Sequence, residues 1–419
     1  MWTRGACDDA VAVGTKSYLD YHKIGDAWRS YRRDFMPAEL GWLGLLTEAP
    51  DHAATSPDEL ELYAARALAL DSPLSLETTL EQIRSNGRVR EMLQQFREYE
   101  RLRIGRKVPA SIREKLTEGE WHLVRRGDEV TFSPVRYDSS TVNVPGGFVL
   151  KNVTRSQPLQ FRLQALPMIA ETGDPSNISL GRSAMPMTLG VPGAQAPMPG
   201  APAGHIDWST KPLDLRRHRA LALTLNVDGV GGGTSTPAVL NVQLEAGGGS
   251  LRDYYIDLDF DGTRTVIVPQ STPNRMLSEL RPAYTTYAIK AALRGFNYGS
   301  VIGVSFRWMR LDGAKPVHCR VSSLEALTER DAPLSRPRIS IGQAAISLPA
   351  ALTPGDYAEY WGEGPIRIFD RGGVPVRSVL PQAPGPQLAP GDNQSRIDAA
   401  GPGRANLTAI ILGEPVPVH

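Results

Sequence analysis

The sequence predicts a mixed, mainly β protein in which an N-terminal α/β segment is followed by β-sandwich or jelly-roll domains. The stretch 253–269, DYYIDLDFDGTRTVIVP, alternates between two kinds of side chain, as in a strand with one face in a core. Helical spacing is confined to the first part of the chain, and from residue 107 strand patterns take over. A chain of 419 residues is also too long for one ordinary core, so we expect several domains.

Residues 1–106 are interpreted as an α/β segment. The apolar run 38–46 contains two glycines and is typical of a strand buried on both faces. Its Ala and Leu residues are also compatible with a helix, which stays an alternative prediction. Ser56, followed by proline and then by Glu59, predicts a helix start with a capping box. Further helices are expected over 76–85 and 89–103. A complete eightfold barrel needs about 250 residues, so this segment would supply only the last unit or two of one.

The rest of the chain divides by composition and by the spacing of turns. Proline, glycine and methionine are concentrated between the β segments, in a stretch that we interpret as a long surface loop without regular structure. The largest β segment has about eight strands in roughly 120 residues, which fits a jelly roll better than an immunoglobulin-like sandwich. The predicted units are a small β region at 107–169, the loop at 170–205, the jelly roll at 206–332 and a small C-terminal β-domain at 333–419.

The stretch 253–269 is predicted to be a hairpin. Asp261 and Gly262 lie between two strand-like runs and are typical of a tight turn within one antiparallel sheet. The alternation places one set of side chains in the core, namely Tyr254, Ile256, Leu258 and Phe260. The opposite set, which we expect to face solvent, is Tyr255, Asp257, Asp259 and Asp261.

Composition excludes several classes of function. Lysine and arginine total 46 and aspartate and glutamate 45, which leaves no bulk positive charge for binding nucleic acid. No apolar run reaches the roughly 18 residues of a membrane helix, and the opening residues lack the pattern of a signal peptide. A secreted or a cytoplasmic location therefore stays open. Cys7 and Cys319 are far apart and outside any Cys/His cluster, so neither a zinc site nor a disulfide framework is expected.

Two parts of the chain resemble known families. The segments LDLRRHRALALTLNVDG, AVLNVQL, RDYYIDLDFDGTRTVIVP and VIGVSFRWMRL resemble galactose-binding-like jelly-roll domains, the fold of many carbohydrate-binding modules. The segment YLDYHKIGDAWRSYRRDFMPAELGWLGLL resembles the closing part of the TIM-type barrel of bacterial glycoside hydrolases. The resemblance implies the C-terminal part of a glycoside hydrolase-like protein, with an oligo- or polysaccharide as its partner. It carries no catalytic pair onto this sequence, because those residues would precede residue 1.

Whether the chain is itself an enzyme is left open, and three carboxylates are the candidates. Glycoside cleavage needs two carboxyl groups about 5 to 10 Å apart on either side of the bond. Asp8 and Asp9 are adjacent and would point to opposite sides of a strand, so a solvated loop or a helix cap is favoured for them. Glu39 lies in the apolar run, where an ion pair with Arg32 or Arg33 is favoured over catalysis.

A sugar-binding platform is expected on the jelly roll, because aromatic faces stack on sugar CH groups and charged groups bind hydroxyls. The residues that we expect to bind ligand are Tyr255, Asp257, Asp259, Tyr284, Tyr287 and Arg310. No cofactor is expected, although the resemblance implies a structural calcium ion as an alternative for the aspartates. Aspartates two apart on a strand are about 7 Å apart, so a solvated face paired with Arg252 or Arg264 is favoured.

Two hypotheses of function follow. The first is a carbohydrate-binding accessory region of a polysaccharide-processing protein. The alternative is a structural or assembly protein whose β-domains contact other proteins, including a second copy in a homo-oligomer.

Overall fold

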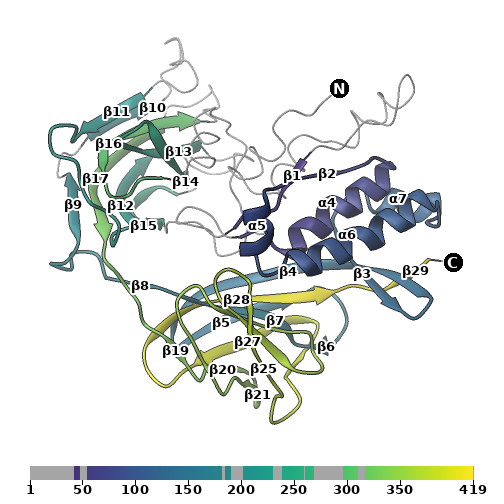
Figure 1. Cartoon of the computed structure of the whole chain (residues 1–419). Coiled ribbons are helices and arrows are strands. Elements are labelled where there is room, and N and C mark those ends of the chain that lie inside the picture. Colours follow the sequence, from purple (N-terminus) through teal and green to yellow (C-terminus); the bar gives the residue numbers. More distant parts are fainter. Residues whose placement is uncertain are drawn as a thin grey trace, which may run out of the picture.

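A computed structural model describes residues 42–47, 54–181, 185–189, 202–229, 238–258, 260–268, 296–309 and 317–418. Strands dominate it, and its helices lie between residues 57 and 115 of the described chain. Figure 1 shows a helical layer lying over one β-sandwich, with a second β-sandwich to the left. The predicted class, mainly β with an N-terminal α/β segment, is confirmed.

The described part of the α/β segment contains a β-α-β unit. Strands β1 (Trp42–Gly44) and β2 (Ser75–Glu77) pair in parallel, and helix α4 (Pro57–Leu70) connects them. The predicted capping box is present, with the Ser56 N–H donating to Glu59 Oε2 at 2.9 Å. The other helices in the described residues are α5 (Leu80–Ser85), α6 (Val89–Ile104) and α7 (Ala110–Lys115).

The helix predicted over 76–85 begins later than expected. Leu76 pairs with Leu43 in the parallel ladder, so the first residues of the predicted helix belong to β2. Thr79 then caps α5, since its side chain accepts a hydrogen bond from the Gln82 N–H at 3.1 Å. A local strand pairing overrides the helical pattern at this end.

The sandwich beneath the helices, here called the C-terminal sandwich, has two antiparallel sheets. One has the order β21-β20-β27-β5 and the other β25-β24-β23-β7-β28-β4-β29, with β3 also paired to β4. The first comprises β5 (Gly146–Asn152), β20 (Arg338–Ile341), β21 (Ala344–Ser347) and β27 (Gly391–Asp398). The second comprises β3 (Glu120–Arg126), β4 (Glu129–Val144), β7 (Gln160–Leu166), β23 (Tyr357–Tyr360), β24 (Ile366–Phe369), β25 (Pro375–Val379), β28 (Gly403–Leu412) and β29 (Val416–Pro417). Short pairs at the margins are β6 (Gln157–Pro158) with β26 (Gln387–Leu388) and β19 (Leu334–Ser335) with β22 (Ala351–Leu352).

The segments 107–169 and 333–419, predicted as separate units, contribute to this one sandwich. Strand β28 pairs with both β4 and β7, and β27 pairs with β5. One core contains Leu163 from the first segment and Ile397 and Leu407 from the second. Sheet partners so distant in sequence leave no local signal, which is why the two halves read as independent units.

The second sandwich, here called the jelly-roll sandwich, is built from the middle of the chain. Its sheets have the orders β10-β17-β12-β15, with β9 also on β17, and β11-β16-β13-β14. The strands are β9 (Ile178–Gly181), β10 (Met185–Leu189), β11 (Pro202–Asp207), β12 (Ala220–Asp228), β13 (Ala238–Ala246), β14 (Ser250–Leu258), β15 (Gly262–Val268), β16 (Val301–Met309) and β17 (Val317–Leu327). The inward stripe of β14 is confirmed, since Tyr254, Ile256, Leu258 and Phe260 are all buried in one core.

The prediction of a hairpin at 253–269 is wrong. Strand β14 pairs with β13, whereas β15 pairs with β12 in the facing sheet. The turn at Asp261 and Gly262 therefore carries the chain from one sheet to the other, with Gly262 in the left-handed region at φ 94°. A turn signal between two strands does not distinguish a hairpin from such a crossing.

The prediction that 170–205 is a loop without regular structure is also wrong. It contains β9, β10 and most of β11, which lie at the margins of the two sheets. Pro186 and Pro202 fall within these strands, and proline is tolerated there because an edge strand can leave a backbone position unpaired. The proline-rich composition therefore marks sheet edges here.

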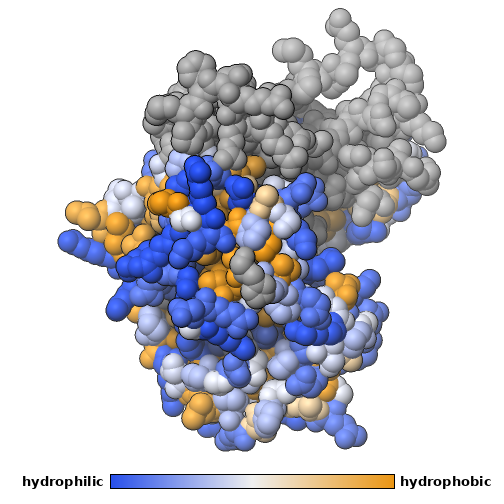
Figure 2. Space-filling view, turned by 90° about the vertical axis from the view of Figure 1, so that its right-hand side faces the viewer, coloured by the Kyte–Doolittle hydropathy of each residue, from blue (hydrophilic) through white to orange (hydrophobic). Residues whose placement is uncertain are grey.

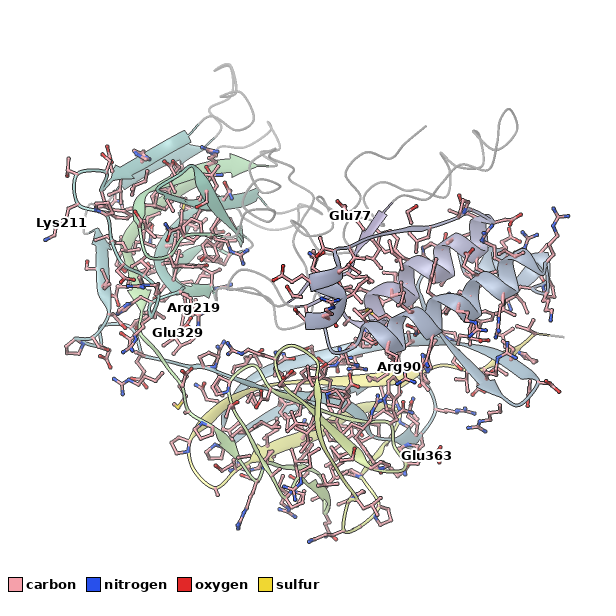
Figure 3. All side chains as sticks on the ribbon, viewed as in Figure 1. Glu77, Arg90, Lys211, Arg219, Glu329 and Glu363 are labelled. Atoms are coloured by element: carbon pink, nitrogen blue, oxygen red, sulfur yellow. The ribbon has the colours of Figure 1, made fainter. Side chains whose placement is uncertain are left out.

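A two-stranded neck joins the sandwiches. Strand β8 (Met168–Ile169) pairs with β18 (Glu329–Arg330), so the chain enters and leaves the jelly-roll sandwich at adjacent points. Arg219 Nη2 lies 2.7 Å from Glu329 Oε2 and ties the neck to the jelly-roll sandwich, as Figure 3 shows. Among the described helices, none is both long and apolar enough to cross a membrane.

Candidate functional site

The strongest candidate site is the outer face of the β11-β16-β13-β14 sheet. In β13, Leu240, Val242 and Leu244 point into the core, so the alternate residues lie on the outer face. The same holds in β16, where Val304 and Phe306 are core residues. The outer positions form what we call the polar face, which comprises Asn241, Gln243, Glu245, Ser305, Arg307 and, on β11, His205.

The polar side chains at the centre of the polar face are almost completely buried. The exposed fractions are 0% for Asn241, 1% for Gln243, 3% for Ser305 and 9% for Arg307. Amide, hydroxyl and guanidinium groups are costly to bury unless they find hydrogen-bond partners. Their concentration on one face of the sheet makes this face the candidate site.

The margin of the polar face is open to solvent and contains three interacting side chains. His205 Nδ1 lies 3.1 Å from Ser305 Oγ and 3.6 Å from Glu245 Oε1. Ser305 Oγ also donates a short hydrogen bond to Glu245. The side chains of His205 and Glu245 are 43% and 26% exposed. A ligand therefore has access to the polar face at this margin.

The contacts among these three side chains differ from those of a nucleophilic triad. In a serine hydrolase the histidine takes the serine proton on one ring nitrogen while a carboxylate orients the other. Here Ser305 and Glu245 both approach the same nitrogen, Nδ1 of His205. Glu245 itself accepts the serine hydrogen bond. The cluster supplies donors and acceptors to a ligand without the geometry of a triad.

The structure places two predicted ligand-binding residues on strand β14 beside this face. Tyr255 stands opposite Asn241 in the ladder, and Asp257 stands opposite Val239. Asn241 in turn faces Arg307 on β16, so Tyr255, Asn241 and Arg307 form one row across the sheet. The side chains of Tyr255 and Asp257 lie outside the described part of the structure. So do the predicted site residues Asp8, Asp9, Glu39, Asp259, Tyr284, Tyr287 and Arg310.

Metal binding finds no support in the described residues, among which no group of three or more His, Cys, Asp or Glu side chains is placed to hold an ion. The calcium alternative involved aspartates of β14 whose side chains are outside that description. It stays a prediction.

A second polar cluster lies buried where the helical layer meets the C-terminal sandwich. Glu359 on β23 is 1% exposed and accepts hydrogen bonds from Arg88 at 3.0 Å and Arg162 at 2.6 Å. Burial alone would raise the pKa of Glu359, but the two guanidinium groups outweigh it and hold this pKa at about 2. Arg162 also lies 2.8 Å from Asp58 on α4, which extends the cluster into the helical layer.

The same junction contains a histidine. Glu61 on α4 lies 2.8 Å from His122 Nδ1 and also accepts hydrogen bonds from the Tyr99 hydroxyl and the Leu123 N–H. The His122 ring stacks on Trp361 with centroids 5.3 Å apart. Burial would lower the pKa of His122, but the charge of Glu61 and its hydrogen bond raise it above the ordinary value.

This junction is a structural feature. Its central carboxylate, Glu359, is paired with three arginines. These are Arg88 at the start of α6, Arg162 on β7 and Arg367 on β24, whose Nη2 lies 3.2 Å from Glu359 Oε2. A carboxylate that is enclosed by cations and removed from water has no free face for a substrate. The pairs fasten the helices to the sheet.

Sequence reasoning missed both groups for identifiable reasons. Glu359 sits within the short strand YAEY, and Asp58 and Glu61 are three apart on a helix that is apolar over most of its length. These carboxylates in apolar surroundings were the available signal for a buried cluster. Asn241 and Gln243 alternate with core residues in AVLNVQLEA, a pattern that predicts only a solvent-exposed strand face. Neither pattern reveals which distant residues stand beside it.

Comparison with known proteins found no matching family model and no matching curated protein.

Proposed function

We propose that the jelly-roll sandwich binds an oligo- or polysaccharide on its polar face. The chain would then be an accessory region of a glycoside hydrolase-like, polysaccharide-processing protein. The observation that carries this proposal is the concentration of amide, guanidinium and carboxylate groups in successive rows on the outer face of one sheet.

The chemistry of the polar face suits a ligand rich in hydroxyl groups. Each sugar hydroxyl both donates and accepts, and the groups within reach of a ligand are those of the open margin, where Glu245 accepts and His205 offers a ring nitrogen. Arg307 and Glu245 carry opposite charges, so the face favours a neutral ligand over a polyanion. Tyr255, in the row of Asn241, is proposed to add an aromatic surface for the sugar ring.

The accessory role is supported by the composition of the α/β segment. One β-α-β unit is described there, from β1 through α4 to β2. The junction cluster fastens this unit to the C-terminal sandwich through Asp58 and Arg162. The two-stranded neck would then carry the carbohydrate-binding sandwich on this joined body.

The test is a screen of neutral oligosaccharides against the full chain, followed by calorimetric titration of the best ligand. Replacement of Glu245 by glutamine keeps the side-chain shape and an acceptor for Ser305 while removing the charge. We expect Glu245→Gln to weaken binding about tenfold or more, as for loss of a hydrogen bond to a charged group. Asp228→Asn, at an exposed position on the facing sheet, is the matched control and should leave the affinity unchanged.

Absence of binding across the screen, or equal affinity of wild type and Glu245→Gln, would reject the proposal. The assembly alternative has its own motivating observation, since Leu80, Val376 and Leu380 are 71%, 64% and 74% exposed. The Gly87 N–H donates to the Gly372 carbonyl at 2.9 Å, which brings the end of α5 beside the β24–β25 connection. Light scattering on the same samples distinguishes the two, because an oligomer without glycan binding favours assembly.

A further inference from the structure

A cavity lies at the corner where α4 and α6 end and α7 begins. Its volume is about 280 Å³, close to the lower end of the range for small-molecule sites, roughly 300 to 1,000 Å³. Three buried apolar residues form part of its lining, namely Leu68, Leu102 and Val108. The rest of the lining is charged and comprises Asp71, Arg103, Arg106 and Arg113. Figure 2 looks onto the side of the helical layer, where hydrophobic side chains gather among hydrophilic ones.

The three arginines differ in how far they are already paired. Arg103 is engaged by both carboxylate oxygens of Glu100, at 2.8 and 2.7 Å, and lies 3.6 Å from Asp71. Within the described part of the chain, Arg106 and Arg113 have no carboxylate partner. The Nε atom of Arg113 is buried there and has no hydrogen-bond partner. A ligand oxygen that reaches this buried donor would satisfy it.

The backbone is strained at two lining positions. Asp71 and Arg106 both have φ of 50°, in the left-handed region, although neither is glycine. Both follow a helix end, where glycine usually takes this conformation because a residue with a Cβ is strained in it. Strain of this kind collects at ligand sites because selection retains the side chain in spite of it.

Compensation of the helix dipoles accounts for only part of the arrangement. Basic residues in the last turn of a helix stabilise its negative terminus, which explains the charge of Arg103 on α6 and of Arg113 on α7. It does not explain why the Nε atom of Arg113 is buried without a hydrogen-bond partner, or why Arg106, which follows the end of α6, also lines the cavity.

We propose that this cavity binds a small organic anion, namely a carboxylate on a compact apolar body. The carboxylate meets Arg106 and Arg113, while the body lies on Leu68, Leu102 and Val108. The volume limits the ligand to about ten non-hydrogen atoms. The cavity is separate from the polar face of the jelly-roll sandwich, so this site does not depend on the proposed carbohydrate binding.

Benzoate is the probe, titrated into the full chain at low salt and followed by NMR or calorimetry. Benzyl alcohol supplies the same body without the charge, and inorganic phosphate supplies charge without the body. We expect saturable binding of benzoate only. The Arg113→Met variant should weaken it at least tenfold, whereas Arg90→Met, at an exposed position on α6 labelled in Figure 3, should not.

Several results would overturn the proposal. They are the absence of saturable benzoate binding, equal binding of benzyl alcohol or phosphate, and unchanged affinity in Arg113→Met. If Arg113→Met fails to fold, Arg106→Met replaces it, because Arg106 is exposed and its removal disturbs no buried contact. Benzoate binding that survives the substitution of Arg106 in that case also rejects the site.

Discussion

The two sandwiches differ in whether the polar residues on an outer sheet face are covered or reach solvent. In the C-terminal sandwich the face turned to the helices is closed by a buried ion cluster around Glu359. In the jelly-roll sandwich the polar face opens to solvent at one margin, at His205 and Glu245. Both sandwiches have apolar cores of the same kind between their sheets.

The difference shows how to separate a structural from a functional polar cluster. At the junction each charge is met by an opposite charge from another element, which leaves nothing for a ligand to satisfy. On the polar face the groups are mixed in kind, form a row and reach solvent, which is what recognition of an outside molecule requires.

The largest effect is expected from breaking the junction. Glu359→Gln leaves Arg88 and Arg162 buried without their shared carboxylate, and breaking such a pair costs about 3 to 5 kcal/mol. Chemical denaturation should show this loss in the free energy of unfolding. Glu363→Gln, at an exposed position labelled in Figure 3, is the control and should change little. Equal stability of the two variants would mean that the cluster fastens nothing.

The same residue gives a pH dependence of known sign. The pKa of Glu359 is lowered from the ordinary value of 4.5 to about 2 in the folded protein. A lowered carboxyl pKa stabilises the fold above pH 4.5, and this contribution disappears as the pH falls through about 2. Wild type and Glu359→Gln should therefore approach each other in stability toward the acid end.

A somewhat smaller loss is expected from the jelly-roll core. Leu244→Ala removes a fully buried side chain and should lower the stability of that sandwich by about 2 to 5 kcal/mol. Differential scanning calorimetry should show the loss in one transition only, since the neck separates the two cores. Ile267→Ala, at a half-exposed position, is the milder control. A shift of all transitions together would show that the sandwiches unfold as one.

The smallest effect should come from His122. Its raised pKa means that the pair with Glu61 stabilises the fold below the ordinary histidine pKa of 6.5 and loses this contribution as the pH rises above the folded value. His122→Gln should therefore cost about 1 to 2 kcal/mol under acidic conditions and less under alkaline ones. Denaturation of both proteins across this range measures it, with the exposed His318→Gln as control. A constant difference across the range would contradict the assignment.

Local features of the fold were predictable because their causes are local. The capping box at Ser56 and Glu59 and the inward stripe of β14 depend on residues within one or two turns or one strand. The choice of sheet for β15 was not predictable, because the turn at Gly262 looks the same in a hairpin and in a crossing. The union of β28 with β4 likewise depends on segments far apart in sequence.

The candidate site was predictable only in outline. Alternation in β14 predicted a polar face that includes Tyr255 and Asp257. Ser305 and Arg307 reach that face from a strand about fifty residues away, and no spacing rule links them to it. The buried role of Glu359 also depends on Arg88 from the helical layer, which a strand pattern does not reveal.

The neck between the sandwiches has a consequence for how the protein is assembled from modules. Because β8 and β18 are hydrogen-bonded neighbours, the ends of the whole jelly-roll sandwich lie side by side. A short turn in place of residues 170–328 would close the C-terminal sandwich without a change of register in its sheets. The jelly-roll sandwich is thus placed as an insertion between two neighbouring points of the chain, a position that tolerates changes within the insert while the C-terminal sandwich keeps its fold.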